Sequence, residues 1–150
     1  MPWTNLRIGR HTTFHGEYFI TFNTQSRINY FHDYELAMLF CRQLAGHEKT
    51  CNCEWLTWML MPDHFHGLLR LNSSSMELAK VVAILKGNSA LALNRKLNKS
   101  GKFWQKSFYD RALRAEDDRV KVARYIVANP VRKGLVASVK QYPFWDSVYL

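Results

Sequence analysis

His64 and His66 are separated by one residue within a hydrophobic run that predicts a β-strand over His64–Leu71. Because side chains alternate between the two faces of a strand, both imidazoles are expected on one face and Phe65 in the opposite layer. Two neutral imidazoles on one sheet face can take two positions around a divalent ion, whereas unpaired imidazoles in a hydrophobic strand would be costly. The pair is therefore a candidate metal site. The alternative is two unrelated histidines, one half-buried and one solvated.

A second candidate is a predicted helix near the C-terminus whose polar residues recur every three or four positions. Its polar stripe consists of Asp118, Lys121, Tyr125 and Asn129, and its apolar stripe, expected to face the core, of Val120, Ala123 and Val127. The phenol of Tyr125 can attack phosphorus to give a phosphotyrosine if a divalent ion neutralises the phosphate charge. The amide oxygen of Asn129 is a suitable third ligand for a hard ion. The alternative is a tyrosine at the rim of the fold, with Asn129 only capping the helix before Pro130.

The composition of the 150-residue chain fits one folded domain, because 47% of the residues are hydrophobic and 14% aromatic. The net charge of +9, from 21 Lys and Arg against 12 Asp and Glu, suggests a polyanionic partner, either nucleic acid or an anionic membrane surface. The longest apolar run, Trp55–Pro62, is too short to cross a bilayer, and no secretory signal is recognisable. Cys41, Cys51 and Cys53 lack CxxC spacing and are expected to be reduced thiols. These features predict a soluble cytoplasmic protein.

The elements that position these residues are predicted in the order β-α-β-β-α-β-α. Segments dense in aromatic and β-branched residues predict strands over Glu17–Thr24, Cys51–Met61, His64–Leu71 and Lys102–Arg114. Apolar residues at helical spacing predict helices over His32–Glu48, Met76–Leu97 and Glu116–Asn129. The second and third strands form a hairpin, which favours an α+β fold: a mainly antiparallel sheet packed against helices, of ferredoxin-like character. Residues 1–15 are expected to be an N-terminal arm and residues 138–150 an aromatic tail.

Local signals predict the ends and faces of these elements. Asp33 is expected to cap the first helix, Ser73–Ser75 to cap the second, and Pro130 to stop the third. The second strand is expected to be central, with one face made of Trp55, Thr57 and Met59 and the other of Leu56, Trp58 and Leu60. The apolar face of the second helix is expected to contain Leu78, Val81, Val82, Leu85 and Leu91.

Three segments resemble the REP-associated tyrosine transposases, which belong to the HUH single-tyrosine transposase superfamily. These segments are MPDHFHGLL (61–69), WQKSFYDR (104–111) and YIVANPVRKGLV (125–136). The start EYFITFNT and the ending YPFWDSVYL also fit the family, so the resemblance covers nearly the whole chain. The joint pattern is specific, because HUH, YxxxN and NPVxxGLV occur in the family's order and at a familiar separation.

The resemblance implies a role for each matching residue. His64 and His66 would bind Mg²⁺ or Mn²⁺, with Asn129 as a further ligand. Tyr125 would cleave single-stranded DNA at hairpins of repetitive extragenic palindromes, leaving a 5′-phosphotyrosine and a free 3′-hydroxyl. Asp63 departs from the family, which more often has Asn before the first histidine. A carboxylate there can add a metal ligand or, as we expect, cap the turn.

Basic side chains on the second helix, the fourth strand and the third helix, which carries Tyr125 and is called the tyrosine helix below, are the expected contacts to DNA. They are Lys86, Lys102, Lys106, Arg111, Arg114 and Lys121. The aromatic residues Trp104, Phe108 and Tyr109 lie between them, an arrangement that suits backbone contacts and base stacking. Trp104 and Phe108 share a face, however, and fit the core better. No glycine-rich phosphate signature is present, so no nucleotide cofactor is expected.

Two other functions fit the same features: a non-catalytic DNA-binding regulator derived from a transposase, and a metal-dependent phosphate-ester hydrolase in which Tyr125 is incidental. The aromatic tail suggests the hypothesis that it docks near the active site and restrains cleavage; the alternative is that it only covers a sheet face. A monomer is expected, although the short loop Arg114–Glu116 would also permit a dimer that exchanges its tyrosine helix.

Overall fold

The computed structural model describes residues 16–150, so the expected N-terminal arm over residues 1–15 lies outside the described residues. Five strands form one sheet in the order β4-β1-β3-β2-β5, and every neighbouring pair is antiparallel. They are β1 (Glu17–Asn23), β2 (Cys53–Met61), β3 (His64–Leu71), β4 (Tyr109–Ala112) and β5 (Trp145–Ser147). The predicted α+β fold and the β2–β3 hairpin are confirmed. Within residues 16–150, no helix is long and apolar enough to cross a membrane.

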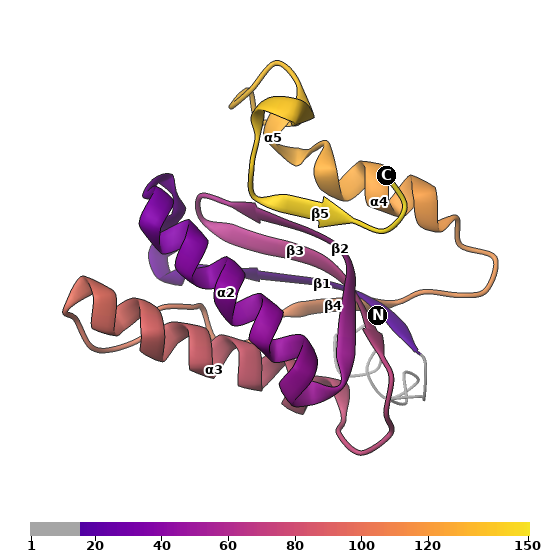
Figure 1. Cartoon of the computed structure of the whole chain (residues 1–150), viewed down its shortest axis with the longest axis horizontal. Coiled ribbons are helices and arrows are strands. Elements are labelled where there is room, and N and C mark those ends of the chain that lie inside the picture. The colour runs from indigo at the N-terminus through magenta and orange to yellow at the C-terminus, as the bar shows by residue number, and fades with distance from the viewer. Residues whose placement is uncertain (1–15) are drawn as a thin grey trace.

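Helices cover both faces of this sheet (Figure 1). Helices α2 (Tyr34–Cys51) and α3 (Leu78–Leu97) lie on one face, and α4 (Arg119–Val127) with the short α5 (Asn129–Arg132) lies on the other. Asp33 caps α2 as predicted, because its Oδ1 accepts hydrogen bonds from the backbone N–H groups of Glu35 (2.8 Å) and Leu36 (3.3 Å). The predicted serine cap of α3 is wrong. Its N-cap is Glu77, without a side-chain bond, and Ser73 accepts from the N–H of Ser75 instead.

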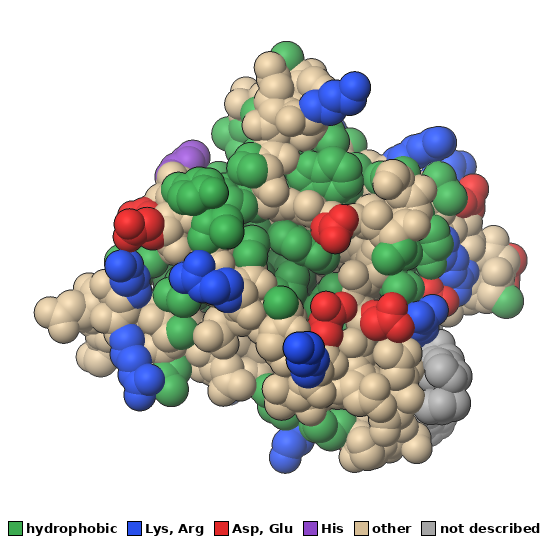
Figure 2. Space-filling view, viewed as in Figure 1, with side chains coloured by type: hydrophobic (Ala, Val, Ile, Leu, Met, Phe, Trp, Pro, Cys, Tyr) green, Lys and Arg blue, Asp and Glu red, His purple; other side chains and the backbone are tan. Residues whose placement is uncertain are grey.

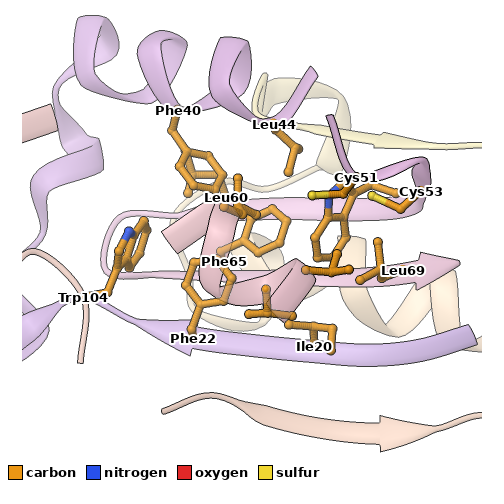
Figure 3. Packing of buried hydrophobic residues seen from close by; sticks show 14 of the residues in the cluster. Ile20, Phe22, Phe40, Leu44, Cys51, Cys53, Leu60, Phe65, Leu69 and Trp104 are labelled. Carbon is orange, nitrogen blue, oxygen red and sulfur yellow. The ribbon is translucent and has the colours of Figure 1, made fainter. Parts of the chain in front are cut away.

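The hydrophobic core is divided by the sheet into two clusters. The larger lies under α2 and α3, where the rings of Phe22, Phe40, Phe65 and Trp104 pack together (Figure 3). The Phe22 ring stands edge-on to Trp104 with centroids 4.7 Å apart, so the assignment of Trp104 to the core is confirmed. The smaller cluster joins the other face to α4 and consists of Leu56, Met59, Met61, Leu68, Ile126 and Val127. The two clusters explain why both faces of β2 are apolar.

A β-bulge in β2 changes which of its side chains share a face. The register with β3 shifts between Trp55 and Thr57, so that Trp55 pairs with Leu69 and Thr57 with Leu68. Leu56 is the extra residue and packs in the smaller cluster together with Met59, whereas Trp55 and Leu60 belong to the larger one. The predicted grouping of faces in β2 is therefore wrong, because a bulge breaks the two-residue alternation.

The predicted fourth strand is much too long. Only Tyr109–Ala112 forms β4, and Trp104 makes a single bridge with Thr24. Between them Ser107 has φ 79°, a left-handed conformation that interrupts an extended chain.

The tyrosine helix is also shorter than predicted, since α4 ends at Val127 and the chain continues through Pro130 as α5. Proline near a helix N-terminus is tolerated because its missing N–H would have no partner there, so Pro130 does not stop helical structure. The expected apolar faces need two corrections. Ile126 is buried and Val120 is only half-buried, and in α3 Leu91 is 53% exposed whereas Leu93 is buried.

Candidate active site

Two imidazoles meet on the sheet face that carries α4. The register of β3 places His66 opposite Thr21 of β1, and His64 opposite Asn23. The ring planes of His64 and His66 are nearly perpendicular (89°), their centroids are 4.4 Å apart, and their Nε2 atoms lie 2.8 Å apart. Phe65 points into the larger core cluster on the opposite face. The predicted arrangement of these three side chains is confirmed.

The other ring nitrogen of each imidazole has its own partner. His64 Nδ1 lies 2.6 Å from Asp63 Oδ1, and His66 Nδ1 lies 3.0 Å from Thr21 Oγ1. When each Nδ1 carries the proton and donates it to that oxygen, the Nε2 lone pairs point toward each other. Hydrogen bonds of this kind orient the histidines of metal sites.

The Asp63 carboxylate therefore has a different role from the expected cap of the turn. One oxygen binds His64, and the other accepts a hydrogen bond of 2.8 Å from Arg27 Nε. Burial alone would raise the pKa of Asp63, but the hydrogen bonds from Arg27 and His64 keep it below its ordinary value. Asp63 is an ionised group that orients His64.

Asn129 reaches the same point from the junction between α4 and α5. Its side chain is buried, and its Nδ2 lies 3.2 Å from His64 Nε2 and also contacts His66 Nε2. Rotation of the amide by 180° exchanges Nδ2 for the oxygen Oδ1, a donor atom that suits hard cations. Asn129, predicted as part of a helical stripe, instead begins α5, but the predicted convergence on the histidine pair is present.

Both imidazoles are held in the neutral form. Burial lowers the pKa of His66 to about 3, with a contribution from neighbouring His64. Burial also lowers the pKa of His64, against the opposing effect of Asp63. A neutral imidazole is the form that binds a metal ion.

The donor atoms at this point are two imidazole nitrogens and one amide. Across the described part of the chain, no group of three or more His, Cys, Asp or Glu side chains is placed to hold an ion. A set of three protein donors leaves positions open for substrate oxygens, as Mg²⁺ sites that bind phosphates require. The residues present therefore fit a divalent ion that is completed by its substrate.

Tyr125 lies on the exposed side of α4, beside the histidines. Its side chain is 59% exposed, and its ring contacts Phe19 of β1 at a centroid distance of 6.4 Å. The guanidinium carbon of Arg132 lies 4.3 Å from the ring centroid, and its Nη1 donates a hydrogen bond of 2.9 Å to the Tyr125 carbonyl. Arg132 therefore joins α5 to α4 and places a positive charge over the phenol ring.

An open cavity of about 710 Å³ connects Tyr125 with His66. It lies between α4 and the strands β1 and β4, and its lining residues are Phe19, Thr21, His66, Tyr109, Arg111, Asp117, Asp118, Lys121, Val122 and Tyr125. None of these residues belongs to the aromatic tail over residues 138–150. A cavity of this size can take a small organic group such as part of a nucleotide.

The six basic residues predicted to contact DNA lie in different places on the protein. Arg111 and Lys121 line the cavity, while Lys102 and Lys106 are exposed on the segment before β4. Arg114 is exposed and lies 3.8 Å from Glu116. On the face shown in Figure 2, lysine and arginine side chains are scattered singly or in small groups, and hydrophobic side chains gather in the upper and central part.

Lys86 has a structural contact that the sequence did not reveal. Its Nζ donates hydrogen bonds to the carbonyls of Gln105 (2.8 Å) and Ser107 (2.5 Å) and lies 5.6 Å from the centroid of the Phe22 ring. It therefore holds the segment that leads into β4.

Sequence reasoning missed four residues of the site. Thr21 contacts His66, and Arg27 binds the Asp63 carboxylate that holds His64. Phe19 and Arg132 flank Tyr125. The alternation in β1 signals that Phe19 and Thr21 share a face, because Tyr18, Ile20 and Phe22 are buried on the other. No signal in the sequence says which strand lies beside that face.

Comparisons with known proteins agree with this fold and with the resemblance in the sequence. Residues 12–129 match the family described as "Transposase IS200 like". A REP-associated tyrosine transposase of Haemophilus influenzae is 28% identical over 142 residues, covering 86% of this chain and 78% of that protein. A solved structure of a REP-associated tyrosine transposase bound to a REP hairpin has a TM-score of 0.76 at 21% identity, covering 91% of this chain and 79% of the other. Since the family match extends over well more than half of the sequence, the chain belongs to the IS200-like transposases.

Proposed function

We propose that this protein is a metal-dependent transposase that cleaves and rejoins single-stranded DNA through Tyr125. The observation that carries the proposal is the convergence of His64, His66 and Asn129, whose polar side-chain atoms meet beside a cavity that also contains Tyr125. A regulator without catalytic activity has no need for this convergence. A hydrolase of small phosphate esters has no need for an exposed tyrosine in the same cavity.

The chemistry at phosphorus follows from the residues in reach of the cavity. The phenol of Tyr125 gives up its proton to solvent as its oxygen attacks the scissile phosphate, and the bond from phosphorus to the 3′-oxygen breaks. The leaving oxygen takes up a proton from solvent and becomes a 3′-hydroxyl. The product is a 5′-phosphotyrosine that a later 3′-hydroxyl can attack to rejoin the strand. A divalent ion held by His64, His66 and Asn129 supplies Lewis-acid stabilisation of the phosphate charge. Arg111 and Lys121 add positive charge along the cavity.

A hairpin formed by a repetitive extragenic palindrome is the proposed substrate. The support is the similarity in fold to a relative that was solved with a REP hairpin, together with the excess of basic residues in this chain. The excess charge also makes binding sensitive to salt, because phosphate contacts release counterions.

The test is a covalent-adduct assay with 3′-labelled hairpin oligonucleotides taken from repetitive extragenic palindromes of the source genome. The label belongs at the 3′ end because a 5′-phosphotyrosine retains the downstream fragment. Wild-type protein with Mn²⁺ or Mg²⁺ should give a labelled protein band in a denaturing gel, and EDTA should abolish it. Tyr125→Phe and His64→Ala should lose at least about a hundredfold in adduct yield, since the first removes the nucleophile and the second a ligand of the ion that stabilises the phosphate charge.

A matched control is Tyr34→Phe, because Tyr34 is an exposed tyrosine on α2 that does not line the cavity. Its adduct yield should equal that of the wild type. Cleavage that survives in Tyr125→Phe would favour the hydrolase instead. Tight hairpin binding with no cleavage by the wild type would favour the regulator.

A further inference from the structure

The cavity beside Tyr125 has an aromatic wall that the proposed cleavage reaction does not use. Phe19 lies at its centre, with ring centroids 6.0 Å from His66, 6.3 Å from Tyr109 and 6.4 Å from Tyr125. Tyr109 stands edge-on to Phe19 (77°), and its side chain is 50% exposed although it belongs to a strand of the sheet. A large aromatic side chain exposed at the mouth of a cavity is suited to stacking on another flat ring.

Acidic and basic side chains both line the cavity. Asp118 caps the N-terminus of α4, and its Oδ1 accepts a hydrogen bond of 3.1 Å from the N–H of Lys121. Asp117 precedes it, and its Oδ2 accepts a hydrogen bond of 2.7 Å from the N–H of Arg114. The hydrogen bond from the Arg114 backbone lowers the pKa of Asp117, so this carboxylate is negative near neutral pH. Asp117 Oδ2 also lies 3.6 Å from Nη1 of Arg111, which lines the same cavity, so the charge of this carboxylate is offset within the protein. The Phe19 and Tyr109 rings, rather than an excess of either charge, distinguish this part of the cavity.

We infer that the cavity binds one unstacked nucleobase, that of a nucleotide adjoining the scissile phosphate, and that Tyr109 is its stacking partner. This inference rests on the proposed function, because it places the base next to the phosphate that Tyr125 attacks. Binding the base holds the phosphodiester between Tyr125 and the histidine pair, so Tyr109 determines where along a strand cleavage occurs. Tyr109 is thus a substrate-binding and specificity-determining residue for the cleavage reaction.

A double-mutant cycle between protein and DNA tests this inference. The substrate is a hairpin oligonucleotide that the wild type converts to adduct, with an abasic nucleotide placed on one side or the other of the scissile phosphate. One of these two abasic substrates should form adduct about tenfold more slowly with wild-type protein, and Tyr109→Ala should cost about the same on the intact substrate. Tyr109→Ala should lose nothing further on the sensitive abasic substrate, because the stacking contact is already gone. Tyr109→Phe keeps the ring and should restore the sensitivity to the abasic nucleotide that Tyr109→Ala has lost.

The control is Tyr34→Ala, which removes an exposed tyrosine outside the cavity and should match the wild type on all substrates. Equal rates on both abasic substrates and on the intact one would overturn the base-binding site while leaving the proposed cleavage intact. Losses that multiply to about a hundredfold would also overturn it, because independent effects multiply. If the wild type forms no adduct with the intact substrate, the proposed function fails, and this inference fails with it.

Discussion

At the scale of single residues, the candidate site depends on side chains that orient the two histidines. Thr21 and Asp63 bind the Nδ1 atoms of the two histidines, and this leaves the Nε2 atoms free to converge. A histidine without such a partner can rotate about its side-chain bonds or take the other tautomer. At the proposed metal site, these second partners should therefore contribute to the affinity for the ion.

Replacing Thr21 by valine tests this dependence. The Thr21→Val variant keeps the branched shape but removes the acceptor for His66 Nδ1, so Mn²⁺ affinity measured by calorimetric titration should fall about 10- to 100-fold. Thr57→Val is the matched control: the Thr57 hydroxyl bonds to Ser147 of β5 at 2.8 Å and not to either histidine, so metal binding should be unchanged. Undiminished Mn²⁺ affinity in Thr21→Val would show that this hydrogen bond does not orient the ligand.

At the scale of elements, close contacts hold the strands that carry the site. Gly67 of β3 faces Trp55, and a Cβ atom at this position would lie 2.5 Å from the indole ring, so β3 needs glycine directly after His66. Lys86 of α3 holds the segment before β4 through the carbonyls of Gln105 and Ser107. Because β4 carries Tyr109 and Arg111 of the cavity, a helix on the opposite face of the sheet helps to position the site.

The contact of Lys86 makes stability depend on pH in a defined direction. Burial lowers the pKa of Lys86 from its ordinary value of 10.5 to about 8. Between these values the unfolded chain binds more protons at this residue than the folded protein does. The contribution of Lys86 to the free energy of unfolding therefore becomes more favourable to the folded state as the pH rises from about 8 to about 10.5. The penalty for burying the charge is complete below about pH 8.

Urea unfolding of the wild type and Lys86→Met at several pH values measures this effect. As the pH rises from about 8 to about 10.5, the free energy of unfolding of the wild type should increase relative to that of Lys86→Met. Lys80→Met, on the exposed side of the same helix, should give a profile parallel to that of the wild type. A constant difference between wild type and Lys86→Met would contradict the expected titration.

At the scale of the whole molecule, the aromatic tail completes the sheet. Strand β5 pairs with β2, and the Tyr142 hydroxyl donates a hydrogen bond of 2.6 Å to the carbonyl of Leu60. Tyr142 packs against both hydrophobic clusters, one of which contains Ile126 of the tyrosine helix. The hypothesis that the tail restrains cleavage stays a prediction, tested by a rise in cleavage on deletion of residues 139–150. Since this deletion also removes β5, it must be accompanied by a measurement of folding.

The Tyr142→Phe substitution tests the structural role of the tail without removing it. Loss of the hydrogen bond to Leu60 should lower the free energy of unfolding by about 1 kcal/mol, measured by urea denaturation. Burial raises the pKa of Tyr142 to about 12, so its hydroxyl stays protonated and able to donate across the working pH range. Tyr34→Phe, at an exposed tyrosine, should leave stability unchanged. Equal stability of Tyr142→Phe and wild type would show that the bond contributes nothing to docking of the tail.

The sequence by itself determined the features that depend on neighbours along the chain. The alternation of a strand places His64 and His66 on one face and Phe65 on the other, and helical spacing with the Asp33 cap predicts α2. The sequence pattern also predicted the α+β fold, because the order of strands and helices restricts the possible layers.

Only the tertiary structure decided which distant residues meet these features. Asn129 contacts His66 from 63 positions away in the sequence, and Thr21 contacts His66 from 45 positions away. Strand register and helix packing bring these residues together, and no local pattern encodes either. The bulge at Leu56 and the left-handed turn at Ser107 changed the predicted strands, because one extra or one turned residue reverses a two-residue alternation. The histidine pair was thus predictable from local geometry. The positions of the Asn129 amide and the Thr21 hydroxyl, and the cavity beside His66, arise from contacts between elements far apart in the chain.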